Sequence, residues 1–514
     1  MQHIFHGEKV SDSHSLQKYK TDASVFSIAP QIVYYPKNTE DVISLVHLCH
    51  AHRAQGEKAS LTVRAGGTCM SGGPLTSDWI VDMTRHMTHI TIDEDRMTAT
   101  VEMGAYFRDI EEKAGAYGLM FPSYPSSHLL CGIGGMIGNN ASGEKSLRHG
   151  PTSANILSLE VVLSDGSVRQ VSPKDLQEPQ DHIEKELVTL YETYSDNLCR
   201  ATGRVPKAAS GYRLEKVIQN GTLNEIPLFV GAQGTLGIVT RAVLRLVPIP
   251  EYLDLLLISA QSLRDISHII DITRKHNPEG LETFDQNTFQ KAVEFLPDDA
   301  GKMLPYIDTN AHLFILAQFS EESEEATHTR RDACLTELTN ANYFVRQLIT
   351  PEDVEAVWHI RRNSFLLMRD HNPPHMKAVP CIEDVIVPVD SLHIFITKLS
   401  EILERNNIEY GFHGHIGDGS LRIIPIFDFT SPTLVTDIVE LMTEVFSLTK
   451  SLHGNMSADH SDGIIRTPFL KEFYGEEISS LFHTIKHLYD PMGILNPGKK
   501  THGTIADIEK YLNR

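Results

Sequence analysis

Three glycine-rich stretches limit what this chain can fold into more than any other feature of its sequence. The first reads VRAGGTCMSGG at residues 63–73 and lies between two short apolar runs, 60–63 and 79–83. Glycine has no Cβ atom, so successive N–H groups in such a turn can surround an anion closely. Because the stretch joins two strands and lacks Gly-Lys-Ser/Thr, it is neither a Rossmann fingerprint nor a P-loop. Taken alone, it is equally compatible with an ordinary glycine-rich hairpin.

Two further stretches favour a ligand over a hairpin. Residues 131–143 read CGIGGMIGNNASG, and residues 231–237 read GAQGTLG. Strand and helix patterns separate the three stretches along the chain. The combination therefore predicts backbone that closely surrounds one extended ligand, and a diphosphate with a flat ring at one end suits this arrangement.

Size, charge and cysteine content narrow the class of protein. A chain of 514 residues is too long for one core, so we expect two or more domains. The formal net charge of −21 argues against a nucleic-acid partner, which requires a basic face. The six cysteines lack C-x-x-C spacing and are interpreted as reduced thiols. No apolar run of about 18 residues predicts a membrane span, and we expect a cytoplasmic protein, or one peripheral to the inner membrane.

The first half of the chain alternates strand and helix patterns. Residues 31–35 and 156–163 are expected to be strands, and an amphipathic helix is expected from residue 39. Alternating apolar residues over 89–102 predict a hairpin. We therefore expect a mixed α and β domain around the three glycine-rich stretches.

A boundary is expected where two prolines, Pro248 and Pro250, punctuate the chain. Beyond it, two strand–helix units cover residues 255–274 and 312–339. They indicate an antiparallel sheet covered by helices. The section from residue 434 onward is expected to be mostly helical.

Histidines and carboxylates gather in two late segments. The sequence FHGHIGDG at 412–419 places His413 and His415 on one face of a strand, because side chains repeat every two residues. Asp459 and His460 follow much later, in SADHSDG. Together these residues could hold a divalent cation, or position a proton acceptor beside an acid. The third interpretation is that they are ordinary hydrogen-bonded residues in turns, since 26 histidines make chance clusters common.

The order of these motifs resembles that of the FAD-dependent oxidoreductases with a flavin domain of the vanillyl-alcohol-oxidase type. Within them, the chain is similar to the D-lactate, glycolate and D-2-hydroxyglutarate dehydrogenase branch. The resemblance spans nearly the whole chain. The matching segments are 35–42, 63–73, 125–143, 230–240, 413–419, 458–463 and 495–499.

The resemblance implies an α+β fold of three parts. Residues 1–247 would form a PCMH-type FAD-binding domain with two subdomains. Residues 248–452 would form an α/β cap domain with an antiparallel sheet that binds the substrate, and residues 453–514 a helical segment that returns to the flavin domain.

The same resemblance implies FAD as the cofactor, bound without a covalent link, because Thr68 stands where bicovalently linked relatives have histidine. Gly132 stands where many relatives have threonine. The residues expected to bind the cofactor are Arg64, Ala65, Gly66, Gly67, Thr68, Cys69, Ser71, Gly72, Pro125, Ser126, Gly132, Gly134, Gly135, Asn139, Asn140, Ser142, Gly143, Gly234, Gly237, Ile238 and Asn496.

The chain departs from this family at the metal site. Many relatives bind a zinc-like ion through two histidines and a glutamate; His415 matches the first histidine, Asp459 takes the place of the glutamate, and Arg422 that of the second histidine. A guanidinium cannot donate a lone pair to a metal. Either His413 or Asp418 completes the ligand set, or no metal binds and Arg422 holds the substrate carboxylate. We favour the second alternative.

The resemblance assigns His460 as the proton acceptor in the oxidation of a D-2-hydroxy acid such as lactate, with hydride transfer from Cα to flavin N5. Arg361 is a second candidate for binding the substrate carboxylate, although it or Arg362 could equally be a surface charge. Lys377 is a weaker candidate. Ile424 replaces an asparagine that some relatives have near the substrate, so the identity of the acid stays open.

Two other functions are compatible with the same flavin domain. One is a non-redox alkyl transfer like that of the ether-lipid synthases, although the histidine segments match the dehydrogenases better. The other is a flavin-binding protein that has lost turnover through Arg422. The expected partners are a small 2-hydroxy acid and an electron acceptor of unknown kind, and a homodimer is left open.

Overall fold

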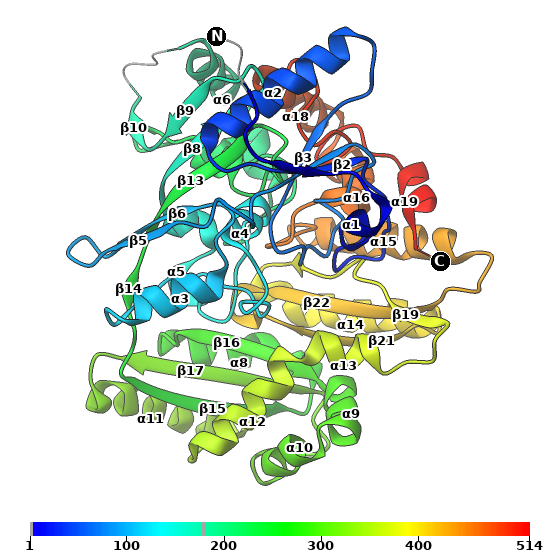
Figure 1. Cartoon of the computed structure of the whole chain (residues 1–514). Coiled ribbons are helices and arrows are strands. Elements are labelled where there is room, and N and C mark those ends of the chain that lie inside the picture. Colours follow the sequence, from blue (N-terminus) through cyan, green and yellow to red (C-terminus); the bar gives the residue numbers. More distant parts are fainter. Residues whose placement is uncertain (1–3, 177–180, 514) are drawn as a thin grey trace.

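A small, mostly parallel sheet begins the fold in the computed structural model, which describes residues 4–176 and 181–513 (Figure 1). Its order is β1-β2-β4-β3, with β1 antiparallel to β2 and the other neighbours parallel. Helix α2 (Thr39–Ala54), which the apolar spacing predicted, covers one face, and α1 (Ser13–Leu16) packs on the other. The strands are β1 (Glu8–Val10), β2 (Ile32–Tyr35), β3 (Leu61–Arg64) and β4 (Trp79–Asp82).

The first glycine-rich stretch is a crossover between β3 and β4. The two strands lie side by side and parallel, with Leu61 opposite Trp79 and Arg64 opposite Asp82. A hairpin joins antiparallel strands, so the hairpin interpretation of this stretch is wrong. Gly67 and Gly72 have φ angles of 72° and 80°, a conformation that glycine adopts without strain.

A second sheet of five antiparallel strands follows, in the order β5-β6-β13-β8-β9. Strands β5 and β6 form the hairpin predicted over 89–102. Strand β13 lies between β6 and β8, so it brings the third glycine-rich stretch, which directly precedes it, into the sheet centre. The strands are β5 (Ile90–Asp93), β6 (Thr98–Glu102), β8 (Ile156–Val162), β9 (Val168–Val171) and β13 (Ile238–Arg245).

Short elements complete this half of the chain. The second glycine-rich stretch forms helix α4, which begins just after the turn that follows β7. This half also contains a two-stranded sheet of β7 and β14 and a three-stranded sheet in the order β10-β12-β11. The bounds are α3 (Phe107–Gly115), β7 (Leu119–Met120), α4 (Ile133–Asn139), α5 (Ser146–His149), β10 (Lys174–Asp175), α6 (His182–Ala201), β11 (Ile218–Gln219), β12 (Thr222–Leu223), α7 (Ile226–Phe229) and β14 (Val247–Pro248).

A large antiparallel sheet fills the lower half of Figure 1, in the order β18-β15-β17-β16-β21-β22-β19, with β20 paired to β22. Every pairing in it is antiparallel. The strands are β15 (Tyr252–Ala260), β16 (Gly280–Asp285), β17 (Leu313–Glu321), β18 (Phe344–Gln347), β19 (Met376–Ala378), β20 (Val385–Ile386), β21 (Glu409–Gly414) and β22 (Ser420–Asp428).

Helices cover both faces of this sheet, which explains why β15 and β17 read as continuous apolar runs. Leu256 and Ile258 pack in one core with α8 and α11, whereas Leu255 and Leu257 pack in another with α9, α10 and α12. The predicted antiparallel sheet and its strand–helix units β15–α8 and β17–α11 are confirmed. The helices are α8 (Ile266–Lys275), α9 (Gln286–Phe295), α10 (Pro297–Met303), α11 (Glu324–Asn340), α12 (Pro351–Arg362), α13 (Ser364–Asp370) and α14 (Leu392–Arg405).

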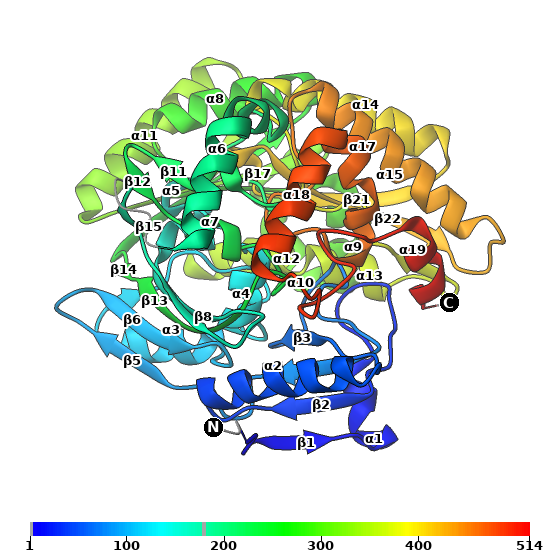
Figure 2. The same cartoon turned by 90° about the horizontal axis from the view of Figure 1, so that it is seen from above.

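The last section is helical and returns to the N-terminal half. Helix α18 packs beside α6 (Figure 2), and Leu495 pairs with Leu61 of β3 as a parallel bridge. The division of the chain at 247/248 and 452/453 stays a prediction. The helices are α15 (Leu434–Ser451), α16 (Gly463–Arg466), α17 (Leu470–Tyr474), α18 (Glu476–Tyr489) and α19 (Ile505–Tyr511).

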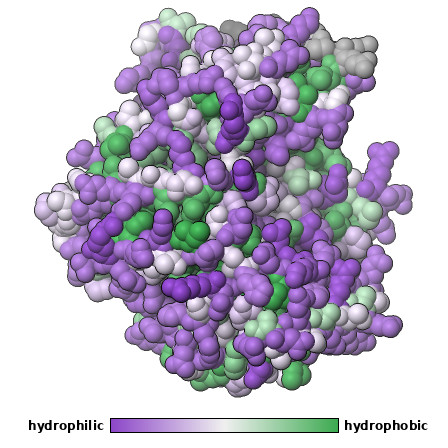
Figure 3. All heavy atoms as spheres, turned by 180° about the vertical axis from the view of Figure 1, so that it is seen from behind, coloured by the Kyte–Doolittle hydropathy of each residue, from purple (hydrophilic) through white to green (hydrophobic). Residues whose placement is uncertain are grey.

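The outer surface is mainly hydrophilic on the face seen in Figure 3, where hydrophobic residues form separate groups between polar ones. Most large apolar side chains lie instead in the cores described above. Among the described residues, no helix combines the length and the apolar character that crossing a membrane requires.

Candidate active site

The three glycine-rich stretches, far apart in sequence, line one cavity. The predicted cofactor residues that line it come from all three stretches. They are Arg64, Ala65, Gly66, Gly67, Thr68, Cys69, Gly134, Gly135, Asn139, Gly234 and Gly237.

Helix α4 presents bare backbone to the cavity, because its glycines Gly134 and Gly138 are one helical turn apart and Gly135 lies beside them. A Cβ on Gly135 or Gly138 would meet its nearest neighbour at 3.9 or 3.8 Å, an ordinary van der Waals contact, so both positions have room for an atom beside the helix. Arg64, also in the wall, has a buried Nη1 that finds no hydrogen-bond partner in the part of the chain that the structure describes. Room along a bare backbone and an unpaired cationic donor fit the anionic dinucleotide that the sequence predicts.

The other predicted cofactor residues do not line this cavity and several have structural roles. Asn140 ends α4 with a φ of 58°. Gly143 lies so close to the chain that a Cβ would sit 1.6 Å from the carbonyl oxygen of Tyr124. The set consists of Ser71, Gly72, Pro125, Ser126, Gly132, Asn140, Ser142, Gly143, Ile238 and Asn496.

The cavity also has walls that the sequence analysis missed. Gln233, inside the third glycine-rich stretch, donates from Nε2 to Asn139 Oδ1 at 3.1 Å and to Ser71 Oγ at 3.2 Å. Its position within the motif GAQGTLG was the one signal that could have selected it. Val63 and Ile137 also lie inside glycine-rich stretches, whereas Met83, Met103 and Phe229 carried no such signal. The missed residues are Val63, Gly73, Pro74, Met83, Met103, Ile137, Gly138, Phe229, Gln233 and Val239.

The loop that carries Asp459 and His460 is anchored on this cavity wall. Ser71 Oγ donates to the carbonyl oxygen of His460 at 3.2 Å. The amide of Gly463 donates to Gln233 Oε1 at 2.9 Å. The segment that carries Asp459 and His460 therefore lies beside the cavity.

The imidazole of His460 is held by a buried carboxylate. Its Nδ1 lies 2.6 Å from Glu383 Oε2, and Arg466 Nη2 donates to the other oxygen, Glu383 Oε1, at 2.6 Å. A neutral imidazole with Nδ1–H on Glu383 keeps its lone pair on Nε2. Burial lowers the pKa of His460, but the carboxylates of Glu383 and Asp384 together outweigh burial, and the pKa of His460 is raised.

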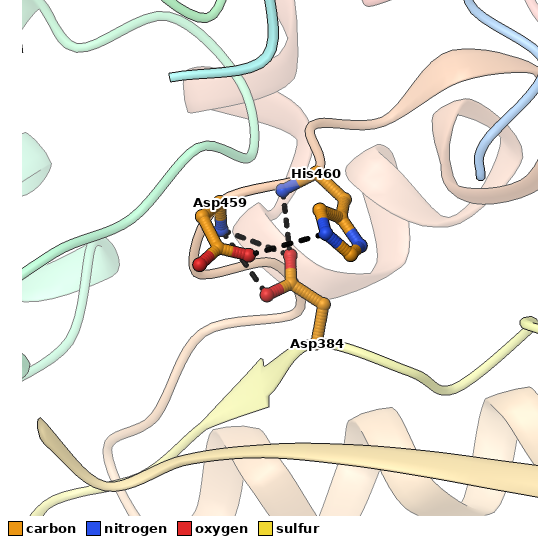
Figure 4. A group of neighbouring side chains, drawn as sticks. All are labelled: Asp384, Asp459 and His460. Carbon is orange, nitrogen blue, oxygen red and sulfur yellow. Dashed lines mark hydrogen bonds and ion pairs between the residues drawn. The ribbon is translucent and has the colours of Figure 1, made fainter. Parts of the chain in front are cut away.

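Asp384 fixes the backbone of the same loop (Figure 4). Its carboxylate accepts hydrogen bonds from the backbone amides of Asp459, at 2.9 Å, and His460, at 2.8 Å, and from Ser457 Oγ at 2.7 Å. Asp384 itself has a φ of 75°, an uncommon conformation for a residue other than glycine. Strand β20 begins at the next residue, so the large sheet positions the loop.

Arg422 lies at the centre of the polar cluster, on β22. Its Nη2 donates to His415 Nε2 at 3.1 Å and lies 3.2 Å from both carboxylate oxygens of Asp459. His415 Nδ1 lies 2.6 Å from Glu282 Oε1. Burial lowers the pKa of His415 and Glu282 only partly opposes this, so the ring is neutral and its Nε2 is an acceptor.

Lys207 brings a second cation from the N-terminal half. Its Nζ donates to Ser142 Oγ at 2.6 Å and lies 3.2 Å from Asp418 Oδ2 and 3.6 Å from Asp459 Oδ2. Burial opposes ionisation of Asp459, but Arg422 and Lys207 hold the pKa of Asp459 well below its usual range. Neither Lys207 nor Glu282 had been selected from the sequence, because each stands outside the histidine motifs.

A divalent cation does not fit among these residues. The described acidic and imidazole groups that lie close enough to share an ion are Asp384, Asp459 and His460. Of these three, Asp384 is used by backbone amides and Asp459 by two cationic side chains, so only His460, through Nε2, keeps a free lone pair. An ion bound by Asp459 would stand next to Arg422 and Lys207, and both would repel it.

The other predicted residues divide between the cluster and the surface. Arg361, 2% exposed, donates to Glu282 Oε2 at 2.5 Å, whereas Arg362 is partly exposed and pairs with Glu144. Lys377 lies away from the cluster and donates to the carbonyl oxygen of Asn513. His413 is buried on β21 opposite Arg422, and its Nδ1 has no hydrogen-bond partner within residues 4–176 and 181–513.

Comparison with known families matches both halves of the chain. Residues 30–172 match the family described as FAD binding domain. Residues 249–500 match the family described as FAD linked oxidases, C-terminal domain. The first match includes the glycine-rich stretches of β3–β4 and α4, and the second includes Arg361, Arg422 and His460.

Three curated proteins are similar over nearly the whole chain. Glycolate oxidase subunit GlcD of Bacillus subtilis is 28% identical over 495 residues, covering 94% of this chain and 91% of that protein. D-lactate dehydrogenase of Archaeoglobus fulgidus is 27% identical over 488 residues, covering 94% and 95%. D-2-hydroxyglutarate dehydrogenase of Haemophilus influenzae is 25% identical over 519 residues. The chain covers 50% of the last protein and so spans half its length.

Solved structures share the fold at low identity. p-Cresol methylhydroxylase aligns with a TM-score of 0.70 at 15% identity, covering 96% of this chain and 94% of that one. Alkyldihydroxyacetonephosphate synthase aligns with a TM-score of 0.66 at 15% identity, covering 95% and 82%. Together with the sheets described above, these neighbours confirm the expected α+β architecture with a PCMH-type flavin domain.

Proposed function

We propose that this chain, which belongs to the FAD-linked oxidases, oxidises a D-2-hydroxy acid of the D-lactate type to the 2-oxo acid. The observation that carries the proposal is the position of a buried imidazole–carboxylate pair, His460 with Glu383, in a loop anchored on the wall of the cofactor cavity. The relatives named for D-lactate, glycolate and D-2-hydroxyglutarate support the class of substrate.

In the proposed reaction, His460 removes the hydroxyl proton at Nε2. Glu383 holds the tautomer that leaves this nitrogen free, and it stabilises the imidazolium that forms. Asp459 Oδ1, 3.5 Å from Nε2, adds to this stabilisation. Bound FAD would supply the two-electron acceptor that receives the hydride from Cα. The C–O bond becomes C=O, so the acid loses one proton and one hydride.

The substrate carboxylate is proposed to bind to guanidinium groups. Arg361 and Arg422 are both buried, and within the described part of the chain the Nε atom of each lacks a hydrogen-bond partner. An unpaired buried donor is costly, so an incoming carboxylate oxygen would be strongly favoured. Arg422 comes from strand β22 of the large sheet, and Arg361 comes from helix α12, which packs on this sheet.

The test is anaerobic reduction of the purified protein. We expect a yellow protein that loses its visible flavin absorbance on addition of D-lactate, D-2-hydroxyglutarate or glycolate, with L-lactate as the stereochemical control. His460→Ala should retain FAD and slow reduction about 100- to 10,000-fold, the usual contribution of a general base. A yellow protein that none of the acids reduces, or a His460→Ala variant reduced at the wild-type rate, would contradict the proposal.

The same experiment addresses the alternatives. The likeness to alkyldihydroxyacetonephosphate synthase concerns the fold alone. A non-redox transferase, or a flavin-binding protein without turnover, would keep its colour with every hydroxy acid tested.

A further inference from the structure

We propose that the guanidinium of Arg422 fills a preformed cation position, so that the protein works there without a metal and becomes a zinc-binding protein when Arg422 is replaced by histidine. The inference concerns the site of the proposed function and rests on it only in assigning Arg422 to the active site. Its test reads metal content and does not depend on turnover.

The first observation is that acceptors converge on a single nitrogen. Arg422 Nη2 lies 3.1 Å from His415 Nε2, 3.2 Å from Asp459 Oδ1 and 3.2 Å from Asp459 Oδ2. An imidazole nitrogen and a carboxylate are ligands that zinc prefers. All three acceptor atoms thus face a point that a cationic N–H group already occupies.

The second observation is that His415 is oriented as metal-binding histidines are. Its Nδ1 is held by Glu282 Oε1 at 2.6 Å, so the lone pair of Nε2 is directed away from Glu282 and toward Arg422. Glu282 is held in turn by Arg361 at 2.5 Å. A carboxylate on the far nitrogen of the ring is the usual second partner of a zinc-bound histidine.

The third observation is that the position of residue 422 can deliver a further ligand. Arg422 lies opposite His413 in the antiparallel pair of β21 and β22. Cross-strand partners have Cβ atoms roughly 4.5–5.5 Å apart and share one sheet face. An imidazole at position 422 would therefore lie beside that of His413, whose buried Nδ1 has no hydrogen-bond partner among the described residues.

Arg422 and a metal exclude one another. A zinc ion bound to His415 Nε2 at about 2.0–2.1 Å would overlap the guanidinium that now lies 3.1 Å from that atom. Two positive charges at this separation also repel each other strongly in a buried site. In the wild-type chain, the guanidinium of Arg422 therefore occupies this position and excludes a metal ion.

Metal analysis tests the inference. After exposure to zinc and gel filtration, we expect no stoichiometric zinc in the wild-type holoprotein and close to one ion per chain in Arg422→His. Arg422→Gln is the matched control: it also removes the charge but supplies no imidazole, and it should bind no zinc. Zinc should raise the melting temperature of Arg422→His alone, and His415→Ala in that background should abolish both effects.

Three results would overturn the inference. One is stoichiometric zinc in the wild type that disappears in His415→Ala. Another is an Arg422→His variant that folds, retains FAD and binds no zinc. The third result applies if that variant does not fold. A chelator that lowers the melting temperature of the wild type, but not that of His415→Ala, would show a metal at the position assigned to Arg422. If the zinc contents are as expected but none of the acids reduces the flavin, the proposed function is rejected and this inference still holds.

Discussion

Glu383 determines the chemistry of His460 although no motif marks it in the sequence. It is fully buried, lies 2.6 Å from His460 Nδ1 and is paired with the fully buried Arg466. The residues that could be predicted, His460 and Asp459, stand together in a short polar segment. Glu383 and Glu282 are single carboxylates distant in sequence, and only the folded sheet brings them to the two histidines.

The positions of Arg361 and Arg362 along the helix could not by themselves predict which of the two side chains is buried. Both stand near the end of α12, one turn from Trp358, and either could have faced solvent. Packing of α12 against the large sheet directs Arg361 inward to Glu282, and Arg362 remains partly exposed. Which of two adjacent arginines is buried depends on the partner of the helix, which the sequence does not specify.

Glu383→Gln should move the pH dependence of flavin reduction to lower pH. The carboxylate raises the pKa of His460 against the opposing effect of burial. Its removal lowers that pKa, so the neutral, proton-accepting ring persists to lower pH and the rising limb of the rate profile shifts with it. The plateau rate should fall about 10- to 100-fold, because the amide no longer enforces one tautomer. Rapid-mixing reduction across a pH series measures both changes.

The matched control is Glu476→Gln, which neutralises an exposed carboxylate paired only with Lys471. It should leave the profile unchanged. An unshifted limb in Glu383→Gln, with normal FAD content, would show that Glu383 does not act on His460 in the reaction.

At the scale of elements, the glycine-rich crossover between β3 and β4 is set by close backbone contact. A Cβ on Gly66 would lie 2.3 Å from the carbonyl oxygen of Leu130 and 3.2 Å from the amide of Gly132. The first and second glycine-rich stretches thus touch through their main chains. Neither side can yield by rotating a side chain, so this contact fixes the shape of the cavity.

Gly66→Ala should therefore weaken FAD binding. Separating the two stretches costs roughly 1–3 kcal/mol, as for other overpacked sites. Gly115→Ala is the control, since a Cβ there meets nothing within 4 Å on helix α3. Flavin content after gel filtration and FAD titration of the apoprotein measure the effect. Wild-type FAD affinity in Gly66→Ala would show that the contact does not shape the cavity.

Individual elements were predictable where the pattern is local. The helix α2, the hairpin of β5 and β6, and the units β15–α8 and β17–α11 all follow from apolar spacing within short windows. The pairing of β3 with β4 was not predictable in this way, because a parallel neighbour is chosen by the rest of the sheet. The same holds for β13, whose partners β6 and β8 lie far earlier in the chain.

At the scale of the whole molecule, the C-terminal section holds together two walls of the cofactor cavity. Asn496 Nδ2 donates to the carbonyl oxygens of Gly73, at 3.0 Å, and Gln233, at 2.7 Å, both of which line the cavity. Thr62 donates to its Oδ1 at 3.1 Å. One buried amide therefore joins the first and the third glycine-rich stretches.

Asn496→Ala should destabilise the protein and lower its FAD content together. It leaves buried carbonyl oxygens without donors, at a cost of roughly 1–3 kcal/mol. Thermal unfolding with and without added FAD measures the change, and the exposed Asn513→Ala is the control. If Asn496→Ala is destabilised to the same extent but binds FAD with unchanged affinity, the amide of Asn496 does not shape the cavity.

The resemblance predicted a three-part architecture and the return of the last segment to the flavin domain. The residues themselves predicted an extended ligand containing a diphosphate, a boundary near Pro248 and an antiparallel sheet covered by helices. Contacts such as those of Lys207 with Asp418 and Asp459 join distant parts of the chain and have no local pattern. Long-range electrostatic partners of this kind follow from the assembled fold.

The bridge between Leu61 and Leu495 has a consequence for biosynthesis. Strand β3 is synthesised early. The side-chain oxygen that accepts a hydrogen bond from the Thr62 hydroxyl belongs to Asn496, which follows 434 positions later. Until that residue is made, the link through Asn496 is missing, and the first and third glycine-rich stretches are held by other contacts, such as the hydrogen bond from Gln233 Nε2 to Ser71 Oγ. We therefore expect a nascent chain stalled before residue 496 to retain less FAD than one that extends beyond it.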